Sequence, residues 1–321
     1  ITFIDEGRGV PPTPALADWF GRSGAEVGDD LIIRPLDVAA HRYAVSLERR
    51  EDRDEATIAE RNRNLADIAE RLVRQGAWDM PDFYLIPRLI GSDVFHGSVA
   101  PDPWDQVLRG DLRFVVRQSY GCSVYLVKQL VDLVQEAWPQ IEDVFGPPHP
   151  PGKWDRAQDE PTRQAWAELL FSQGMEYRWA HDNLWAEACY RAAVRLDPGH
   201  SDAWGHIGNI RLEEGLIAEA LDLYRRAQAA AEARTIGDPD SYGRPFWLDL
   251  DSRPYLRALH GIGLCLWRLG RADEAREVFV RMLALNPNDN QGVRFLIPDL
   301  DAGLTWEEVV ARDEGDEALN H

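Results

Sequence analysis

Residues 170–198 read LFSQGMEYRWAHDNLWAEACYRAAVRLDP, and their pattern of small and aromatic residues occurs twice more in the chain. An offset of 34 residues aligns it with residues 204–227, and an offset of 89 aligns it with residues 259–287. The second offset is two periods of 34 plus 21 residues, which indicates an insertion before the third copy. The matching positions are Gly174, Gly208 and Gly263; Ala186, Ala220 and Ala275; Tyr190, Tyr224 and Phe279; and Pro198 and Pro287. Self-similarity at this period predicts an array of helix pairs.

The repeated residues have a physical role in such an array. A glycine in the first helix of a pair lets the neighbouring helix approach closely, and the aromatic residue of the second helix fills the crossing. Proline in 197–199 and 286–288 ends the second helix, while Gly215 and Gly270 lie where the two helices must turn. This pattern resembles the tetratricopeptide repeat (TPR) family, over roughly the last half of the chain.

Composition narrows the class of protein. With 45% hydrophobic and 28% charged residues, the 321-residue chain is that of a folded protein with more than one domain. We expect no membrane span, because no apolar run approaches the length of about 20 residues that a bilayer requires. We also expect no signal peptide from ITFIDEGRGV, although a start at Ile1 rather than Met is compatible with a trimmed N-terminus. Three scattered cysteines without a CxxC motif favour a reducing, cytoplasmic location.

The first 50 residues predict a small β element. Two strand-like runs, Leu31–Ile33 and His41–Leu47, follow a short helical turn at Pro14–Phe20, and a Gly28-Asp29 turn signal precedes the first strand. This order is similar to the swapped-hairpin barrels of AbrB-type regulators. A β-sheet cap without a ligand is the alternative.

Residues 51–146 predict a second, mixed module. An amphipathic helix over Asp54–Arg74 is followed by short helices at Phe83–Ile90 and Asp102–Leu108 and by strands at Arg113–Val116 and Ser123–Val127. The order resembles a winged helix of the HARE-HTH type, found in the delta subunit of bacterial RNA polymerase. The residues that match its D-x-RF motif are Asp111, Arg113 and Phe114.

Four cations in this module form a candidate nucleic-acid face. Residues 106–131 carry four basic residues and one acidic residue, a local charge of +4 − 1 = +3 in a chain of net charge −20. The four cations are Arg109, Arg113, Arg117 and Lys128. The presumed recognition helix, however, begins with Asp102 and Asp105, whose carboxylates would repel phosphates. We therefore favour protein binding over nucleic-acid binding for this module.

The rest of the chain completes the domain organisation. A helix over Lys128–Phe145 leads to a Pro-rich linker at 147–163, and the repeat array occupies 164–306. The insertion at 234–253 carries Phe246 and Trp247, which we expect to plug the gap where the array is interrupted. The acidic tail, 307–321, predicts a solvated or disordered end. The expected fold is thus mainly α: a TPR-like α-solenoid of about three helix pairs after a small β element and a winged-helix-like α+β module.

No pattern in the chain indicates catalysis, and we predict neither a cofactor nor a metal. Gly-rich phosphate loops, GxSxG, HExxH and EF-hand spacings are absent from the sequence. His181 and His206 lie on predicted repeat helices, where polar surface positions are the ordinary interpretation. An enzyme is therefore not expected.

The resemblance to TPR proteins implies a concave groove, lined by the first helix of each pair, that holds a partner peptide. Polar residues expected at that groove are Arg178, His206, Asn209, Arg257 and His260; Phe171, Met175, Asp202 and Leu264 are expected beside them. We predict a cytoplasmic, non-enzymatic protein–protein interaction adaptor without membrane contact. The alternative is a regulator associated with DNA or the transcription machinery, with the winged helix touching the nucleic acid and the repeats recruiting a partner.

One TPR subclass grips a C-terminal carboxylate, and we predict that this chain lacks that clamp. The five clamp positions, which are two lysines, an arginine and two asparagines in the subclass, here hold Phe171, Met175, His206, Arg257 and Gly261. Only Arg257 keeps the cationic character. A peptide ending in Glu-Glu-Val-Asp, titrated by fluorescence anisotropy, should show no micromolar binding; a micromolar Kd would contradict the prediction.

Overall fold

The computed structural model describes residues 22–24, 29–37, 42–76, 79–95, 99–118, 122–137 and 152–319. They belong to two compact units: residues 1–111 with 116–125, and residues 112–115 with everything from 126 onward. Within the described residues, no helix combines the length and the apolar character needed to cross a membrane. The helical turn expected at Pro14–Phe20 and the start of the Pro-rich linker lie outside the described residues.

The first unit begins with a two-stranded hairpin, as the sequence predicts. Strands β1 (Asp30–Asp37) and β2 (Arg42–Glu48) pair antiparallel, with Ile33 opposite Val45. At the base of the hairpin, the Arg49 guanidinium donates to the Asp29 carboxylate at 2.7 Å. The likeness to AbrB-type barrels stays a prediction.

The remainder of the first unit surrounds a small three-stranded sheet. Its elements in chain order are α2 (Glu55–Arg74), β3 (Asp79–Pro81), α3 (Asp82–Ile90), α4 (Trp104–Gly110), β4 (Phe114–Gln118) and β5 (Cys122–Leu126). The sheet order is β3-β5-β4, and α2 packs against α3 and α4. Helix α2 starts where expected, because the Asp54 carboxylate accepts from the Thr57 amide at 3.1 Å and caps its first turn.

Strand β3 is not predicted by the sequence, and helix α4 begins two residues later than predicted. Three residues are too few to show strand alternation, so β3 is defined only by its pairing with β5, in which Met80 lies opposite Val124. Helix α4 begins at Trp104 because Pro101 and Pro103 precede it and fix an extended entry.

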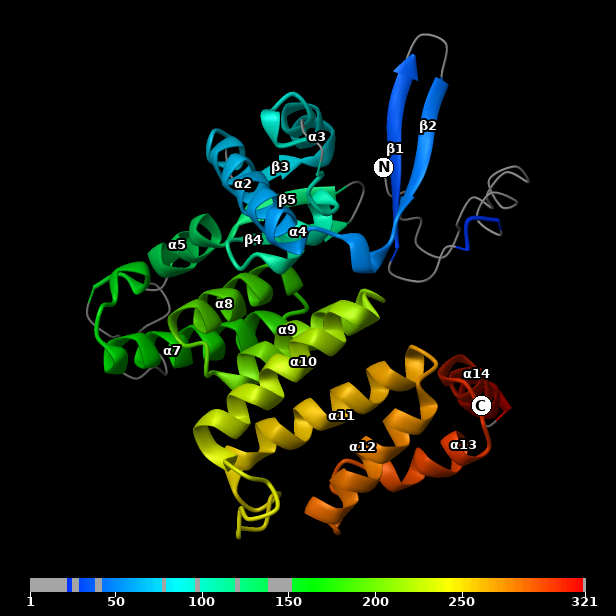
Figure 1. The fold of residues 1–321 in the computed structure, drawn as a ribbon. Helices are drawn as coiled ribbons and strands as arrows, with labels where there is room; N and C mark the ends of the chain where they lie inside the picture. Colours follow the sequence, from blue (N-terminus) through cyan, green and yellow to red (C-terminus); the bar gives the residue numbers. More distant parts are fainter. Residues whose placement is uncertain are drawn as a thin grey trace. The chain divides into compact units, whose positions relative to one another are not determined.

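The second unit is an array of paired helices, which confirms the predicted solenoid (Figure 1). Consecutive helices of the array pack on one another, and α5 lies against α8. The helices are α5 (Val127–Ala137), α7 (Glu160–Trp179), α8 (Asn183–Leu196), α9 (Ser201–Glu213), α10 (Ile217–Ala231), α11 (Arg253–Arg268), α12 (Ala272–Leu285), α13 (Ile297–Asp301) and α14 (Trp306–Leu319).

Inside each helix pair, an aromatic ring lies directly on a glycine. A Cβ atom added to Gly174 would lie 2.5 Å from the Tyr190 ring, and one on Gly208 would lie 3.0 Å from the Tyr224 ring. Gly263 makes the same contact with Phe279. Any larger residue would push the two helices of a pair apart, so the repeated glycines are explained by close packing.

The turns inside the helix pairs require left-handed backbone. Gly215 and Gly270 have φ values of 77° and 73°, which glycine adopts without steric cost. The equivalent position of the first pair is His181, with φ of 60°. The expectation of a helical His181 is therefore wrong: its place in the turn between α7 and α8 demands this strained conformation.

The insertion between α10 and α11 is folded onto the array. Phe246 is buried, 4.8 Å from Tyr242 and 5.8 Å from Tyr255 between ring centroids. The Arg234 guanidinium makes two hydrogen bonds of 2.5 Å to the Asp197 carboxylate, in the loop after the first helix pair. Of the two residues predicted to fill the interruption, Phe246 is buried and Trp247 is partly buried against the core. Arg234 holds the start of the insertion.

A buried ionic cluster joins the first helix pair to the second. Glu187 of α8 accepts from the Arg191 Nε atom at 2.6 Å and from both terminal nitrogens of Arg211 in α9. These three side chains are 0–2% exposed, and Glu214 also accepts from Arg211, at 2.6 Å. Because an unpaired charge is costly in such surroundings, the cluster holds only while its members stay together.

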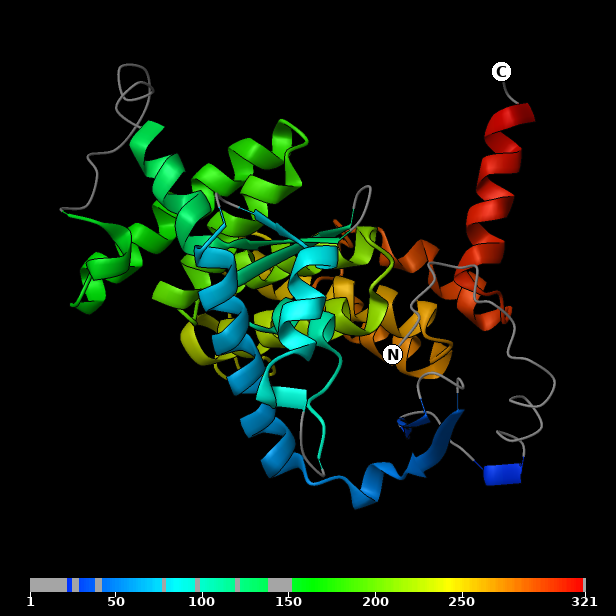
Figure 2. The same ribbon diagram turned by 90° about the horizontal axis from the view of Figure 1, so that it is seen from above.

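The acidic tail forms a helix whose start packs on the array. Helix α14, red in Figure 2, continues to Leu319, through most of the segment expected to be solvated or disordered. The Trp267 indole donates to the Leu304 carbonyl at 2.8 Å, and its ring lies 5.5 Å from that of Trp306. These contacts fix the start of the helix, which charge composition alone does not reveal.

Two glycine-to-alanine substitutions in matched helix interiors should have opposite effects on stability. Gly263→Ala places a methyl group into the Phe279 ring and should lower the free energy of unfolding by about 1–3 kcal/mol. At Gly205 of α9 an added Cβ meets nothing within 4 Å. There, alanine should raise the free energy of unfolding by up to about 1 kcal/mol through helix propensity. Urea denaturation measures both; stabilisation by both would disprove the packing role.

Candidate functional site

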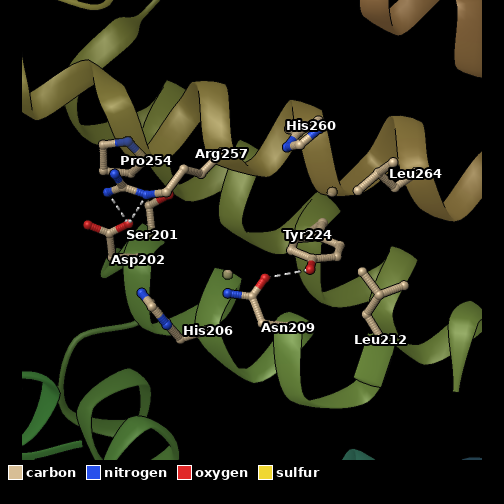
Figure 3. Close-up of a pocket in the computed structure, with 12 residues that line it drawn as sticks. Ser201, Asp202, His206, Asn209, Leu212, Tyr224, Pro254, Arg257, His260 and Leu264 are labelled. Atoms are coloured by element: carbon tan, nitrogen blue, oxygen red, sulfur yellow. Dashed lines mark hydrogen bonds and ion pairs between the residues drawn. The ribbon is translucent and has the colours of Figure 1, made fainter. Parts of the chain in front are cut away.

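A cavity of about 230 Å³ lies between the second and third helix pairs (Figure 3). Helices α9 and α11 form its walls and Tyr224 of α10 its floor. Four of the residues expected at the groove line it: His206, Asn209, Arg257 and His260. Asp202 and Leu264, expected beside them, line it as well.

The charged groups of the cavity are paired with each other. The Arg257 guanidinium binds one Asp202 oxygen through Nη2 at 2.5 Å and through Nε at 3.1 Å, which links α11 to α9. The Arg257 side chain is 47% exposed and that of Asp202 is 22% exposed, so the pair lies at the rim (Figure 3). An exposed pair contributes little to stability, but it leaves the wall without net charge.

The floor of the cavity is rigid. The Tyr224 hydroxyl donates to the Asn209 Oδ1 atom at 2.6 Å, and this bond fixes both side chains (Figure 3). The Tyr224 ring lies on Gly208 of its own helix pair and on Gly261 of the next. Leu212 and Leu264 add apolar surface beside it. The site therefore presents an aromatic and aliphatic surface with a few fixed polar groups, as binding pockets commonly do.

Both histidines of the cavity favour the neutral form. Burial lowers the pKa of His206 to about 4, and nearby Arg257 and Arg178 act in the same direction while Asp202 opposes them. Burial also lowers the pKa of His260, against the opposing charge of Asp289. At neutral pH both imidazoles are thus uncharged ring surfaces.

Arg178 does not reach this cavity. Its guanidinium donates to the Asn183 Oδ1 atom at 2.6 Å and forms an ion pair with Glu213. In the same first pair, the Met175 sulfur accepts from the Tyr190 hydroxyl at 3.3 Å, the counterpart of the Asn209–Tyr224 bond. These contacts occupy the groove side of the first helix pair with the chain's own groups.

Sequence reasoning missed the two residues that hollow the cavity, Gly205 and Gly261. Gly261 was noted only as a departure from the carboxylate clamp. The signal was present, because the aligned copies have side chains at these positions: Phe171 aligns with Gly205, and His206 aligns with Gly261.

The four cations of the candidate nucleic-acid face are divided between the two units. Arg109 is 5% exposed, and its Nε atom lies 3.9 Å from the Asp105 carboxylate. Lys128 binds Asp132 at 2.9 Å and Asp155 at 2.7 Å. Arg117 is half-buried, and the Arg113 guanidinium lies 5.7 Å from the centre of the Phe114 ring. Arg109 is thus too buried, and Lys128 too well paired with carboxylates, to contribute to an exposed cationic surface.

The described side chains show no arrangement suited to a metal. Across the described part of the chain, His, Cys, Asp and Glu form no group of three or more that could hold an ion. The three cysteines are buried, and burial raises the pKa of each thiol, to about 11 for Cys122 and about 12 for Cys265.

Helix pairs with this spacing, packing and groove define a repeat protein, and comparison with known families agrees. Residues 172–234 and residues 256–289 each match the tetratricopeptide repeat family. These two segments of the second unit thus carry tetratricopeptide repeats. No curated protein matches the sequence closely enough to be counted as a relative.

Several solved TPR structures are similar to parts of the chain. The first TPR domain of Spaghetti bound to an HSP90 peptide is 18% identical, covering 44% of this chain and 96% of that one, with a TM-score of 0.35. The N-terminal domain of stress-induced protein-1 from C. elegans is 16% identical, covering 43% and 97%, with a TM-score of 0.35. YrrB, a TPR protein with an unusual peptide-binding site, is 22% identical, covering 42% and 73%, with a TM-score of 0.18.

The depressed pKa of His206 predicts a loss of stability in mild acid. Its pKa of about 4 in the folded chain lies below the value of about 6.5 expected on unfolding, so the unfolded state binds the proton first. The contribution is fully present above pH 6.5 and is lost as the pH falls toward 4, by about 2–3 kcal/mol at most.

Urea denaturation at about pH 7 and about pH 4.5, on the chain and on His206→Phe, measures this term. The substitution keeps an aromatic ring against Phe171 and Tyr190 but cannot titrate. The variant should therefore lose less stability in acid than the unmodified chain. Equal losses would show that His206 does not contribute.

Proposed function

We propose that the chain is a non-enzymatic adaptor that binds a peptide segment of a partner protein in the groove of its repeats. The observation that carries the proposal is the cavity between α9 and α11, because it opens on the face lined by the first helices of the pairs. Such helices line the binding groove in the TPR family. The groove residues of the proposal are His206, Asn209, Arg257 and His260; Arg178, which pairs with Glu213, lies outside the cavity.

The groove groups suit a peptide with both apolar and polar contacts. The amide nitrogen of Asn209 is turned toward His206 in Figure 3, while its oxygen is held by Tyr224. The amide can therefore donate to a peptide carbonyl without rearranging. Because the rim charges of Asp202 and Arg257 are paired, a strongly charged peptide would have to break that pair before gaining a new one.

A cytoplasmic site of action belongs to the same proposal. Each of the three cysteines is free and buried, with no disulfide among them, as is usual in a reducing compartment. Burial and the raised thiol pKa values also make these cysteines poor nucleophiles, which is consistent with structural roles.

A second candidate is a regulator whose first unit contacts DNA or the transcription machinery. The element order α2-β3-α3-α4-β4-β5 with sheet order β3-β5-β4 favours it, since this is the arrangement of a winged helix. The electrostatics oppose the DNA contact: Arg109 is buried, and Lys128 is paired with Asp132 and Asp155. We therefore place protein contact by this unit ahead of nucleic-acid contact.

A displayed library of random linear peptides, selected against the full chain, tests the adaptor proposal. We expect enriched peptides with micromolar affinity that fall at least tenfold in affinity for Arg257→Glu, which replaces the rim pair by two repelling carboxylates. Arg271→Glu is the matched control, because Arg271 pairs with Glu274 beside the turn that follows α11 and does not line the cavity.

Fluorescence anisotropy with each enriched peptide measures both variants. Equal binding to the chain and to Arg257→Glu would place the peptides outside the groove and contradict the proposal. Failure to enrich any peptide would contradict it as well.

A further inference from the structure

Between the first and second helix pairs, aromatic rings of the chain fill the groove. Phe171 of α7 and His206 of α9 both lie against Tyr190 of α8, with ring centroids 5.7 Å and 5.3 Å from the tyrosine. The Phe171 and His206 rings lie 5.4 Å apart, and His200 lies 4.8 Å from Phe171. These separations are those of favourable aromatic pairs.

One repeat further along, two of these rings are missing. The position of Phe171 is taken by Gly205, that of His206 by Gly261, and that of Tyr190 by Tyr224. Tyr224 keeps its place against the glycine of its own pair and is 3% exposed, and it lines the space that the absent side chains leave. The cavity therefore occupies, between the second and third helix pairs, the place that the Phe171 and His206 rings fill between the first and second pairs.

Gly205 and Gly261 differ in whether the surrounding packing leaves room for a side chain. A Cβ on Gly261 would lie 2.5 Å from the Tyr224 ring, so this glycine is needed for the tyrosine to sit between the two helix pairs. A Cβ on Gly205 meets nothing within 4 Å, so no internal packing requires a glycine there. In a helix interior a glycine costs about 1 kcal/mol relative to alanine. Gly205 thus keeps a space open at a cost in stability.

The third copy shows that this position usually carries a ring. His260 aligns with Phe171 and Gly205, and its imidazole lies 6.2 Å from the Phe279 ring of the same helix pair. The side chain at this point of the first helix faces the aromatic residue of the second in the first and third pairs. In the second pair this position is Gly205, which carries no ring.

Size and charge limit what can occupy the space. An apolar cavity of ~150 Å³ is enough for benzene in an engineered protein core, so about 230 Å³ admits a phenyl, phenol or indole ring. The lining charges, Asp202 and Arg257, neutralise each other, and both histidines favour the neutral form. An uncharged ring is therefore the matching occupant.

We infer that the cavity is a socket for one aromatic side chain of a bound peptide, which supplies over Tyr224 the ring that Phe171 supplies over Tyr190. The inference rests on the proposed function, since it names the anchor of the peptide that the groove binds. The partner is then a peptide segment whose phenylalanine, tyrosine or tryptophan side chain enters the cavity. Gly205 and Gly261 are the residues that create this specificity.

Indole is the probe that tests the socket directly, by ¹H–¹⁵N chemical-shift titration of the full chain. We expect saturable binding with a Kd on the order of a millimolar, with shifts centred on residues 205–212 and 257–264. Gly205→Phe fills the socket with the ring of the first pair, so indole affinity should fall at least tenfold without loss of thermal stability. Gly205→Leu, a smaller side chain from the same position, should weaken binding as well.

Ala218→Phe is the matched control, because Ala218 is exposed on α10 and does not line the cavity; it should leave indole binding unchanged. Cyclohexanol, the saturated counterpart of phenol, should bind about two- to tenfold more weakly than phenol, since aromatic pairs contribute about 0.5–1.5 kcal/mol beyond buried area. Equal affinity for the two probes would overturn the aromatic assignment.

Absence of saturable indole binding, or binding that Gly205→Phe leaves unchanged, would overturn the socket. That failure is distinct from failure of the adaptor proposal. Library peptides that bind in the groove and tolerate replacement of every aromatic residue by alanine would overturn the socket alone. Indole binding that Gly205→Phe abolishes, together with a library that yields no peptide, would support the aromatic site and overturn the adaptor.

Discussion

The contact between an aromatic ring and a glycine inside each helix pair is the constraint on which the second unit depends. Tyr190, Tyr224 and Phe279 can lie at the crossing only because Gly174, Gly208 and Gly263 have no side chain. The contact sets how closely the two helices of a pair approach, and therefore where the first helices of successive pairs stand beside one another. The groove is a consequence of that packing, since α9 and α11 flank the ring of α10.

The sequence predicts the repeat array well because its packing rule recurs at a fixed spacing. Gly215 and Gly270, the aromatic residues and the proline stops each identify a feature that the structure confirms. In the first unit, α2 was predictable from its apolar spacing and its Asp54 cap, whereas β3 was not. A three-residue strand carries no periodic signal and exists only through its partner β5. Helix α14 was missed because two tryptophan contacts, rather than composition, fix its start.

The candidate site was predictable only in part. Alignment of the copies brought His206, Asn209, Arg257 and His260 to the groove side, and the structure gathers these four around one cavity. The pairing of Arg257 with Asp202 joins α11 to α9, and the alignment of the copies does not reveal it because the partner residues differ between copies. The burial of Arg109 depends on tertiary packing, so counting its charge overstated the cationic surface of the first unit. The cavity itself arises because Gly205 and Gly261 have no side chains, and glycines are not among the chemically active residue types that indicate a site in a sequence.

The buried Glu187–Arg211 pair also fixes the order of the repeats. At the equivalent points of the next interface the chain has Leu221 and Leu266, both buried and apolar. If the second and third pairs exchanged places, Glu187 would face a leucine and keep Arg191 as its partner, while Arg211 would keep Glu214 of its own pair but lose the carboxylate of Glu187. The buried junction would then lose its balance of charge. The pairs therefore share one backbone plan but are not interchangeable modules. An engineered array with reordered or added repeats would therefore have to keep the helix pair that carries Glu187 directly before the helix pair that carries Arg211.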